Sequence, residues 1–152
     1  MPHHVFIVED HALMRDMVAT FLGSLPDLHV CGSARTAEDA LRQLPDSADL
    51  VLIDIALPGM SGIDLVPELR ARRPDVTCLV CSGHDEASYV QRALDAGVHG
   101  YVAKGHPAEL AEAIQCVLRG ERYLSASLRE RVEAAPGEEP EDTCGPISTF
   151  RT

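Results

Sequence analysis

Apolar and polar positions alternate along the chain with two different periods. Short apolar runs, typical of buried strands, occur at residues 5–8, 29–34, 50–53, 77–81 and 101–103. A helical pattern, with apolar residues three and four positions apart, follows each run. We expect these helices at about residues 14–25, 37–44, 63–72, 86–96 and 107–119. Five strand–helix units predict a parallel sheet covered by helices on both faces, because parallel neighbours need a crossover connection.

Residues with special backbone preferences mark the ends of the helices. Pro45 ends the second helix, and Thr36 is placed to cap its start. Gly97 follows the fourth helix, where a C-terminal glycine is common. Pro67 falls inside the third pattern, and proline is tolerated only near the first turn of a helix, so the start of this helix is left open.

These elements predict a doubly wound α/β domain over residues 1–122, with a five-stranded parallel sheet in the flavodoxin-like order 2-1-3-4-5. A short C-terminal helix, with Ser125 as its cap, is expected over residues 123–135. Residues 136–152 are rich in Pro, Gly and acidic side chains and are interpreted as a tail or linker. In such sheets ligands bind beyond the carboxyl ends of the strands.

Charge and hydropathy exclude several classes of function. The 152 residues carry a formal net charge of −11, which makes phosphate backbones repulsive, so we expect no direct binding of nucleic acid by this chain. No apolar run approaches the roughly 18 residues of a membrane span. The first residues lack the pattern of a secretory leader. We therefore expect a cytoplasmic protein without membrane contact.

Polar residues that suit a metal and phosphate site follow four of the five strands. They are Glu9, Asp10, Asp54, Ser82 and Lys104. In the predicted strand order these side chains surround one cleft. Clustered carboxylates repel one another and favour a bound cation, and Mg²⁺ prefers oxygen ligands of this kind. A carboxylate beside a cation and a lysine can act as a nucleophile toward a phosphoryl group.

Taken together, these motifs resemble the receiver domains of two-component response regulators. The resemblance rests on Glu9-Asp10, the segment 54–62 (DIALPGMSG), Ser82-Gly83, Tyr101 and Lys104, in this order. It covers about residues 3–120. Residues 10–15 (DHALMR) and 120–125 (GERYLS) are similar to the subgroup that usually carries a LuxR-type helix-turn-helix.

The resemblance implies a phosphoacceptor signalling switch. Asp54 would accept a phosphoryl group from a sensor histidine kinase or a histidine phosphotransfer protein. Asp10 would bind Mg²⁺ directly and Glu9 through water, with Asp54 and the carbonyl of Ala56 as further ligands.

The resemblance also implies how the site would respond to phosphorylation. Lys104 would pair with a phosphoryl oxygen and Ser82 would hydrogen-bond the phosphoryl group, while Tyr101 changes rotamer in step. Apart from its own phosphoryl transfer and autodephosphorylation, no enzyme activity is expected.

Rival functions of the same architecture fit less well. Hydrolases with an aspartate nucleophile typically carry Asp-x-Asp, and the second position here is Ala56. A flavin module needs a small, hydroxyl-rich phosphate loop after the first strand, where this chain has Glu9-Asp10. A phosphorylation-independent, receiver-like interaction domain is kept as the alternative.

The C-terminus departs from the subgroup pattern. Leu124 is followed by 152 − 124 = 28 residues, too few and too polar for a helix-turn-helix. A stand-alone receiver and a longer protein cut within its linker both stay open. A homodimer is also left open, through the faces of the first and fifth helices or of the fourth and fifth.

Overall fold

The computed structural model describes residues 2–83 and 87–125. Within these ranges six strands form one parallel sheet in the order β2-β1-β3-β4-β5-β6. The strands are β1 (His3–Val8), β2 (Leu28–Ala34), β3 (Leu50–Ile53), β4 (Thr77–Ser82), β5 (Gly100–Ala103) and β6 (Tyr123–Leu124). The helices are α1 (Ala12–Gly23), α2 (Ala37–Gln43), α3 (Gly62–Arg72), α4 (Ala87–Ala96) and α5 (Pro107–Leu118).

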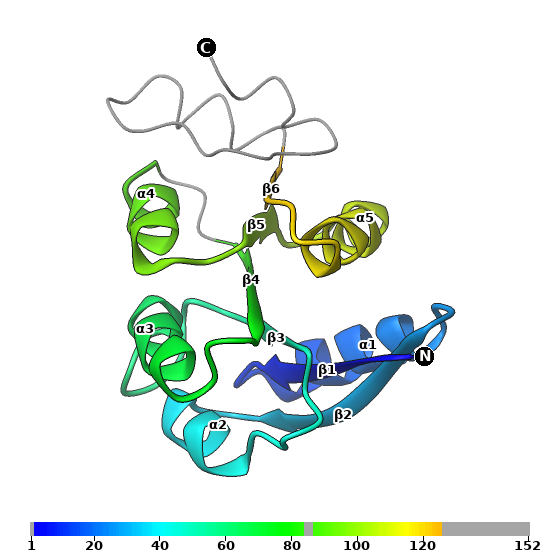
Figure 1. Ribbon diagram of the computed structural model, residues 1–152, viewed down its shortest axis with the longest axis horizontal. Coiled ribbons are helices and arrows are strands. Elements are labelled where there is room, and N and C mark those ends of the chain that lie inside the picture. The colour runs from blue at the N-terminus through cyan, green and yellow to red at the C-terminus, as the bar shows by residue number, and fades with distance from the viewer. Residues whose placement is uncertain (1, 84–86, 126–152) are drawn as a thin grey trace.

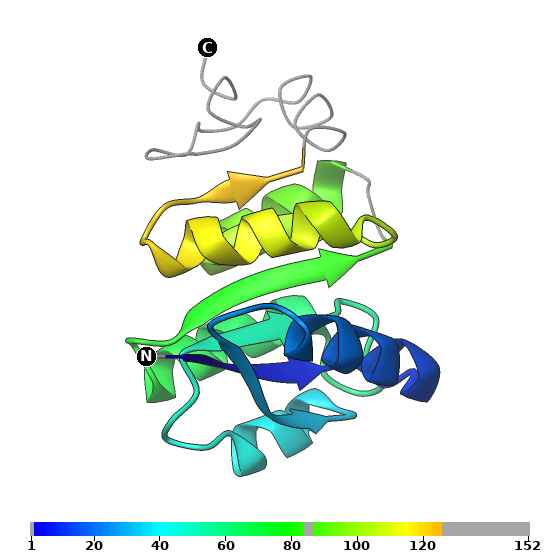
Figure 2. The same cartoon turned by 90° about the vertical axis from the view of Figure 1, so that its right-hand side faces the viewer.

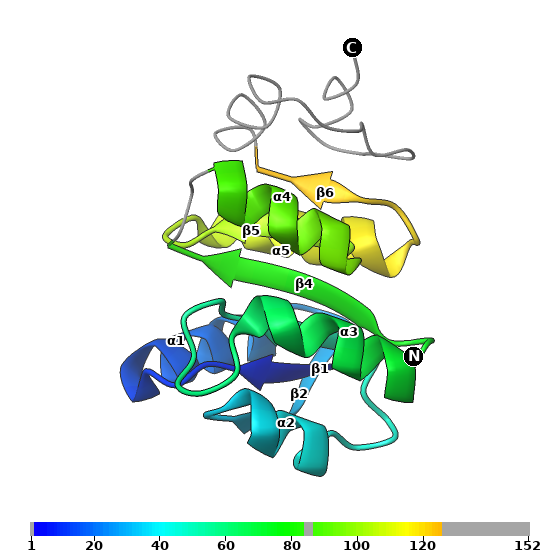
Figure 3. The same cartoon turned by 90° about the vertical axis from the view of Figure 1, so that its left-hand side faces the viewer.

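Helices cover both faces of the sheet, as predicted. Figure 1 shows α2, α3 and α4 on one side and α1 and α5 on the other, with β2 and β6 at the two edges. The arrowheads in Figures 2 and 3 point the same way along the sheet. The carboxyl ends of the strands therefore lie along one edge, where a doubly wound fold places its ligands.

The central strands are buried on both faces because helices pack on both. Every residue of β3 and the last four residues of β1 are buried. Glu9 and Asp54 directly follow these two strands and are also buried, each with 5% of its surface exposed. A rigid apolar sheet thus fixes the backbone of two carboxylates at its edge.

The sheet has one more strand than the five predicted. Residues 123 and 124, expected to open a C-terminal helix, instead form β6, which pairs in parallel with Gly100 and Tyr101 of β5. A strand of two residues leaves no alternating pattern in a sequence, so periodicity could not predict it. The rest of the expected helix and the acidic tail, residues 126–152, lie outside the described residues.

The helix ends follow the predicted signals with one exception. Thr36 caps α2 by accepting a hydrogen bond from the Asp39 amide at 3.0 Å, and Gly97 follows α4 with φ 102°. Pro67 lies inside α3 rather than in its first turn. Pro67 is exposed, so the hydrogen bond that it cannot donate is lost on the solvent side of the helix. None of the described helices is both long and apolar enough to cross a membrane.

Gly62 lets α3 begin against the backbone of the loop that follows β3. A Cβ atom at this position would lie 2.1 Å from the carbonyl oxygen of Asp54 and 2.8 Å from Cγ2 of Ile53. The Gly62 amide donates to the carbonyl of Ile55 at 3.0 Å. The loop therefore folds back directly behind Asp54 only because no side chain is present.

Gly62→Ala is expected to lower the free energy of unfolding by about 3 kcal/mol, because the backbone around Asp54 must move to admit the methyl group. Gly23→Ala is the matched control, since a Cβ at Gly23, the last residue of α1, meets nothing within 4 Å in the described structure. This control should be as stable as the wild type or slightly more stable. Urea unfolding measures both variants, and equal midpoints for the two would contradict the packing argument.

Candidate functional site

Three carboxylates converge at the carboxyl ends of β1 and β3. Glu9, Asp10 and Asp54 each offer one oxygen, and these oxygens all lie within 4.8 Å of one another. Glu9 and Asp54 are buried, whereas Asp10 is exposed. Like charges at this spacing repel one another, so the cluster favours a bound cation, and its oxygen donors suit Mg²⁺. The fold thus brings together the acids that the sequence singled out.

Lys104, on the loop between β5 and α5, supplies a positive charge to this cluster. Its Nζ atom lies 3.0 Å from Oε1 of Glu9 and 3.1 Å from Oδ2 of Asp54. Burial alone would lower the pKa of the Lys104 ammonium, but the hydrogen bond to Glu9 and the charge of Asp54 outweigh burial and raise this pKa above its ordinary value. The ammonium therefore bridges the ends of β1 and β3.

Two further groups, which the sequence did not point out, hold Glu9. The His11 amide donates to Oε2 of Glu9 at 3.2 Å, and Nη1 of Arg15 donates to the carbonyl of Glu9 at 2.8 Å. Burial raises the pKa of the Glu9 carboxyl, the bond from Lys104 opposes this, and the charge of Asp54 raises it again. The sequence signals for Arg15 are its place in the first turns of α1, close behind the acidic pair, and its position at the end of the DHALMR stretch.

The other predicted site residues lie close in the fold. Ser82 is wholly buried at the end of β4, and its carbonyl accepts a hydrogen bond from the Lys104 amide at 3.0 Å. Tyr101 is wholly buried in β5, while Ala56 is exposed on the loop after Asp54. The backbone thus joins Ser82 to Lys104, and the functional roles of Ser82, Tyr101 and Ala56 stay predictions.

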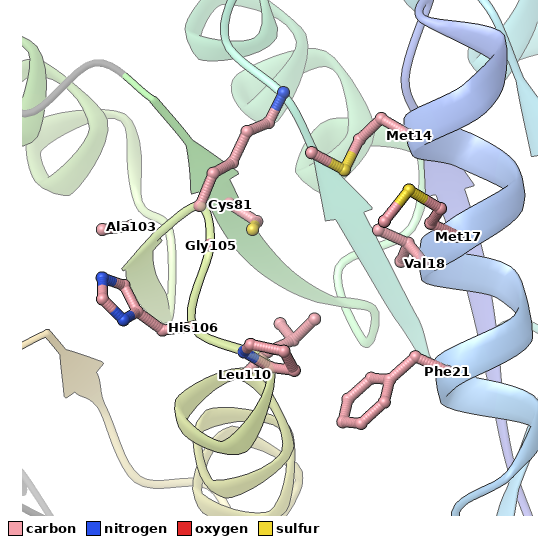
Figure 4. A pocket seen from close by; sticks show the side chains of 11 residues that line it. Met14, Met17, Val18, Phe21, Cys81, Ala103, Gly105, His106 and Leu110 are labelled. Carbon is pink, nitrogen blue, oxygen red and sulfur yellow. The ribbon is translucent and has the colours of Figure 1, made fainter.

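An apolar groove of about 190 Å³ lies beside the acidic cluster, between α1 and α5. Its walls include Met14, Met17, Val18 and Phe21 of α1 and Leu110 of α5 (Figure 4). Lys104 borders this groove and also contacts Asp54. Leu13 and Met17 of α1 are 63% and 58% exposed, and Met17 also lines the groove, so apolar surface continues from the groove onto α1. Exposed apolar surface of this kind is typical of contact with another protein.

Comparison with known proteins decides the family. The family model described as the response regulator receiver domain matches residues 5–115. The chain belongs to this family. It is therefore the receiver domain of a two-component response regulator, a signalling module rather than a metabolic enzyme.

Relatives of this receiver are longer proteins. The response regulator GacA of Pseudomonas viridiflava is 32% identical over 130 residues, which cover 84% of this chain and 61% of GacA. The response regulator UvrY of Escherichia coli (strain K12) is 30% identical over 149 residues, which cover 97% of this chain and 68% of UvrY. The chain thus spans about three fifths of GacA and two thirds of UvrY.

A solved structure supports the resemblance to LuxR-type members. The two-component response regulator of the LuxR family from Aurantimonas sp. SI85-9A1 superposes with a TM-score of 0.84 at 28% identity. The match covers 88% of this receiver and 97% of that chain. The α/β fold and the LuxR-type resemblance predicted from the motifs are confirmed.

Lys104→Met is expected to make folding stability more sensitive to pH. The variant loses the hydrogen bond and the charge that lower the pKa of Glu9, so this pKa rises further above its ordinary value of 4.5. A carboxyl with a raised pKa binds more protons in the folded state than in the unfolded state, so stability falls as pH rises through the folded pKa. When the pH is raised from 5 to 7.5 in EDTA, we expect the free energy of unfolding of the variant to fall by about 1–2 kcal/mol more than that of the wild type.

Urea unfolding at the two pH values measures this loss. Arg42→Met is the control, because Arg42 pairs with Asp39 on the exposed surface of α2, away from the acidic cluster. If the free energy of unfolding depends on pH in the same way in Lys104→Met and Arg42→Met, Lys104 does not balance the charge of the buried carboxylates.

Proposed function

We propose that this receiver is a phosphorylation switch in which Asp54 accepts a phosphoryl group from a histidine kinase or a histidine phosphotransfer protein. The observation that carries the proposal is the bridge from Nζ of Lys104 to the carboxylates of Glu9 and Asp54. It places a potential nucleophile, further acidic ligands and a fixed cation at one sheet edge. Membership of the receiver family supports a signalling role for this arrangement.

In the proposed reaction a carboxylate oxygen of Asp54 attacks the phosphorus atom of a phosphohistidine. An O–P bond forms while the P–N bond breaks, and the electron pair of that bond remains with the imidazole nitrogen. The burial of Asp54 at the end of β3 holds the nucleophile in one orientation, which lowers the entropic cost of reaching the transition state.

Glu9, Asp10 and Asp54 would hold Mg²⁺, Asp10 directly and Glu9 through water, with the carbonyl of Ala56 as a further ligand. The donors are all oxygens, and the exposed Asp10 leaves one side of the cluster open to solvent. This suits a hard ion that retains part of its water shell. When bound, Mg²⁺ neutralises charge on the oxygens of the transferring phosphoryl group.

Three other residues would respond to the phosphoryl group. Lys104 would pair with one of its oxygens and stabilise the charge that develops during transfer. The hydroxyl of Ser82 would hydrogen-bond the group and draw its loop inward, and Tyr101 would change rotamer in step. The surface of α4, β5 and α5 would then shift between two states. The same site would later hydrolyse its own phosphoaspartate.

The phosphodonor protein would dock on the apolar groove between α1 and α5. Lys104 borders the groove, so a donor seated there brings its phosphohistidine close to Asp54. A second copy of this chain is a further partner that the exposed Leu13 and Met17 would suit. We place the protein in the cytoplasm, and we propose that this domain does not itself contact nucleic acid.

Incubation with acetyl phosphate and Mg²⁺ tests the switch directly. We expect a single phosphoryl adduct, seen by intact mass and by Phos-tag mobility, that disappears in EDTA and in Asp54→Ala. Asp64→Ala is the matched control, because Asp64 is an exposed aspartate on α3 outside the acidic cluster, and it should label like the wild type.

Two outcomes would overturn the proposal. Labelling that persists in Asp54→Ala would place the acceptor elsewhere. A folded wild-type protein that takes no label from acetyl phosphate, phosphoramidate or a phosphorylated histidine phosphotransfer protein would favour the alternative, a phosphorylation-independent interaction domain.

A further inference from the structure

Ser125, the first residue after β6, is wholly buried and hydrogen-bonded to both β5 and α5. Its amide donates to the carbonyl of Tyr101 at 3.1 Å. Its hydroxyl oxygen accepts from the Ala103 amide at 3.1 Å and donates to Oε1 of Glu109 at 2.5 Å. One hydroxyl therefore connects the last residue of β5 with the first turn of α5. The sequence suggested a helix cap for Ser125, whereas its hydroxyl bonds to these two elements.

Lys104 lies in the short loop that this hydroxyl spans. The loop, residues 104–106, begins directly after Ala103. Gly105 has φ 92°, and a Cβ there would meet nothing within 4 Å in the described structure. The Lys104 amide bonds to β4 through Ser82, and the Ser125 hydroxyl holds the loop from the β6 side. Hydrogen bonds from two sides thus hold the start of the loop that carries the ammonium.

A hydroxyl is needed because β6 is so short. The ladder between β5 and β6 ends at the pair Tyr101 and Leu124, and the Ala103 amide is satisfied by the side chain of Ser125 instead of a backbone carbonyl. The bond to Glu109 joins a hydroxyl to a carboxylate at a distance typical of strong, charge-assisted hydrogen bonds. Alanine at position 125 would leave the Ala103 amide and the Glu109 carboxylate without this partner.

We propose that Ser125 is a positioning residue for Lys104. Its hydroxyl fixes the backbone on either side of the β5–α5 loop, and this holds the ammonium within reach of Glu9 and Asp54. The inference rests on the proposed phosphoacceptor function. Ser125, although it lies outside the acidic cluster, would then affect the rate of phosphoryl transfer to Asp54.

Ser125→Ala is expected to slow phosphorylation by acetyl phosphate roughly tenfold at saturating donor and Mg²⁺, because a displaced ammonium stabilises the transition state less well. The Mg²⁺ dissociation constant, measured by calorimetry, should not rise, since the proposed metal ligands do not include Lys104 or Ser125 and a displaced ammonium repels the ion less. Ser125→Thr, which keeps the hydroxyl, should restore the rate. In a Lys104→Ala background, Ser125→Ala should slow the reaction no further.

A second variant tests the same inference from the half-buried Glu109 of α5. Glu109→Ala removes the acceptor of the Ser125 hydroxyl without opening the core and should slow phosphorylation in the same direction. Glu112→Ala is the matched control. Glu112 lies one turn further along α5 and accepts from the Tyr123 hydroxyl at 3.1 Å, so it ties α5 to β6 without reaching the loop. The Glu112→Ala variant should be phosphorylated at the wild-type rate.

The outcomes separate the two proposals. If Asp54 labels normally and both Ser125→Ala and Glu109→Ala react at the wild-type rate, Ser125 does not position Lys104. An equal slowing by Ser125→Ala with and without Lys104 would also overturn the inference, because the effect would not pass through the ammonium. Absence of Asp54-dependent labelling in the wild type would instead overturn the proposed function.

Discussion

The balance of charge at the sheet edge is the constraint on which the site depends. Two buried carboxylates, Glu9 and Asp54, lie at the ends of neighbouring strands, and burying such groups without a countercharge is costly. The Lys104 ammonium contacts both of them and supplies that charge from a third strand end. A group that adds or redistributes charge here must therefore disturb all three strands, which is the property that a phosphorylation switch needs.

The parallel sheet makes this arrangement possible. Because β1, β3 and β5 run in the same direction, residues that are far apart along the chain end at one edge. Helices on both faces leave the backbone little freedom to relax when the charge at the edge changes. The short loop after β5 carries Lys104, which ties it directly to both carboxylates.

The sequence predicted the strand order and the acidic cluster because both follow from regular patterns. Apolar runs ending in Glu9 and Asp54 mark strand ends, and parallel strands bring such ends together. The roles of Arg15, Gly62 and Ser125 were not predictable in this way. Each depends on the backbone of another segment: the Arg15 guanidinium bonds to a carbonyl, Gly62 has no Cβ to clash with one, and the Ser125 hydroxyl bonds to an amide. Such contacts have no period along the chain, and β6 was missed for the same reason.

The central claim is that Asp54 is the phosphoacceptor, and chemical trapping of the acyl phosphate tests it most directly. Borohydride reduces a phosphoaspartate to homoserine, and peptide mass mapping then locates the modified residue. The account predicts homoserine at position 54 alone, formed only when Mg²⁺ and a phosphodonor are both present. Homoserine at another aspartate, or none in a protein that has taken up phosphate, would contradict it.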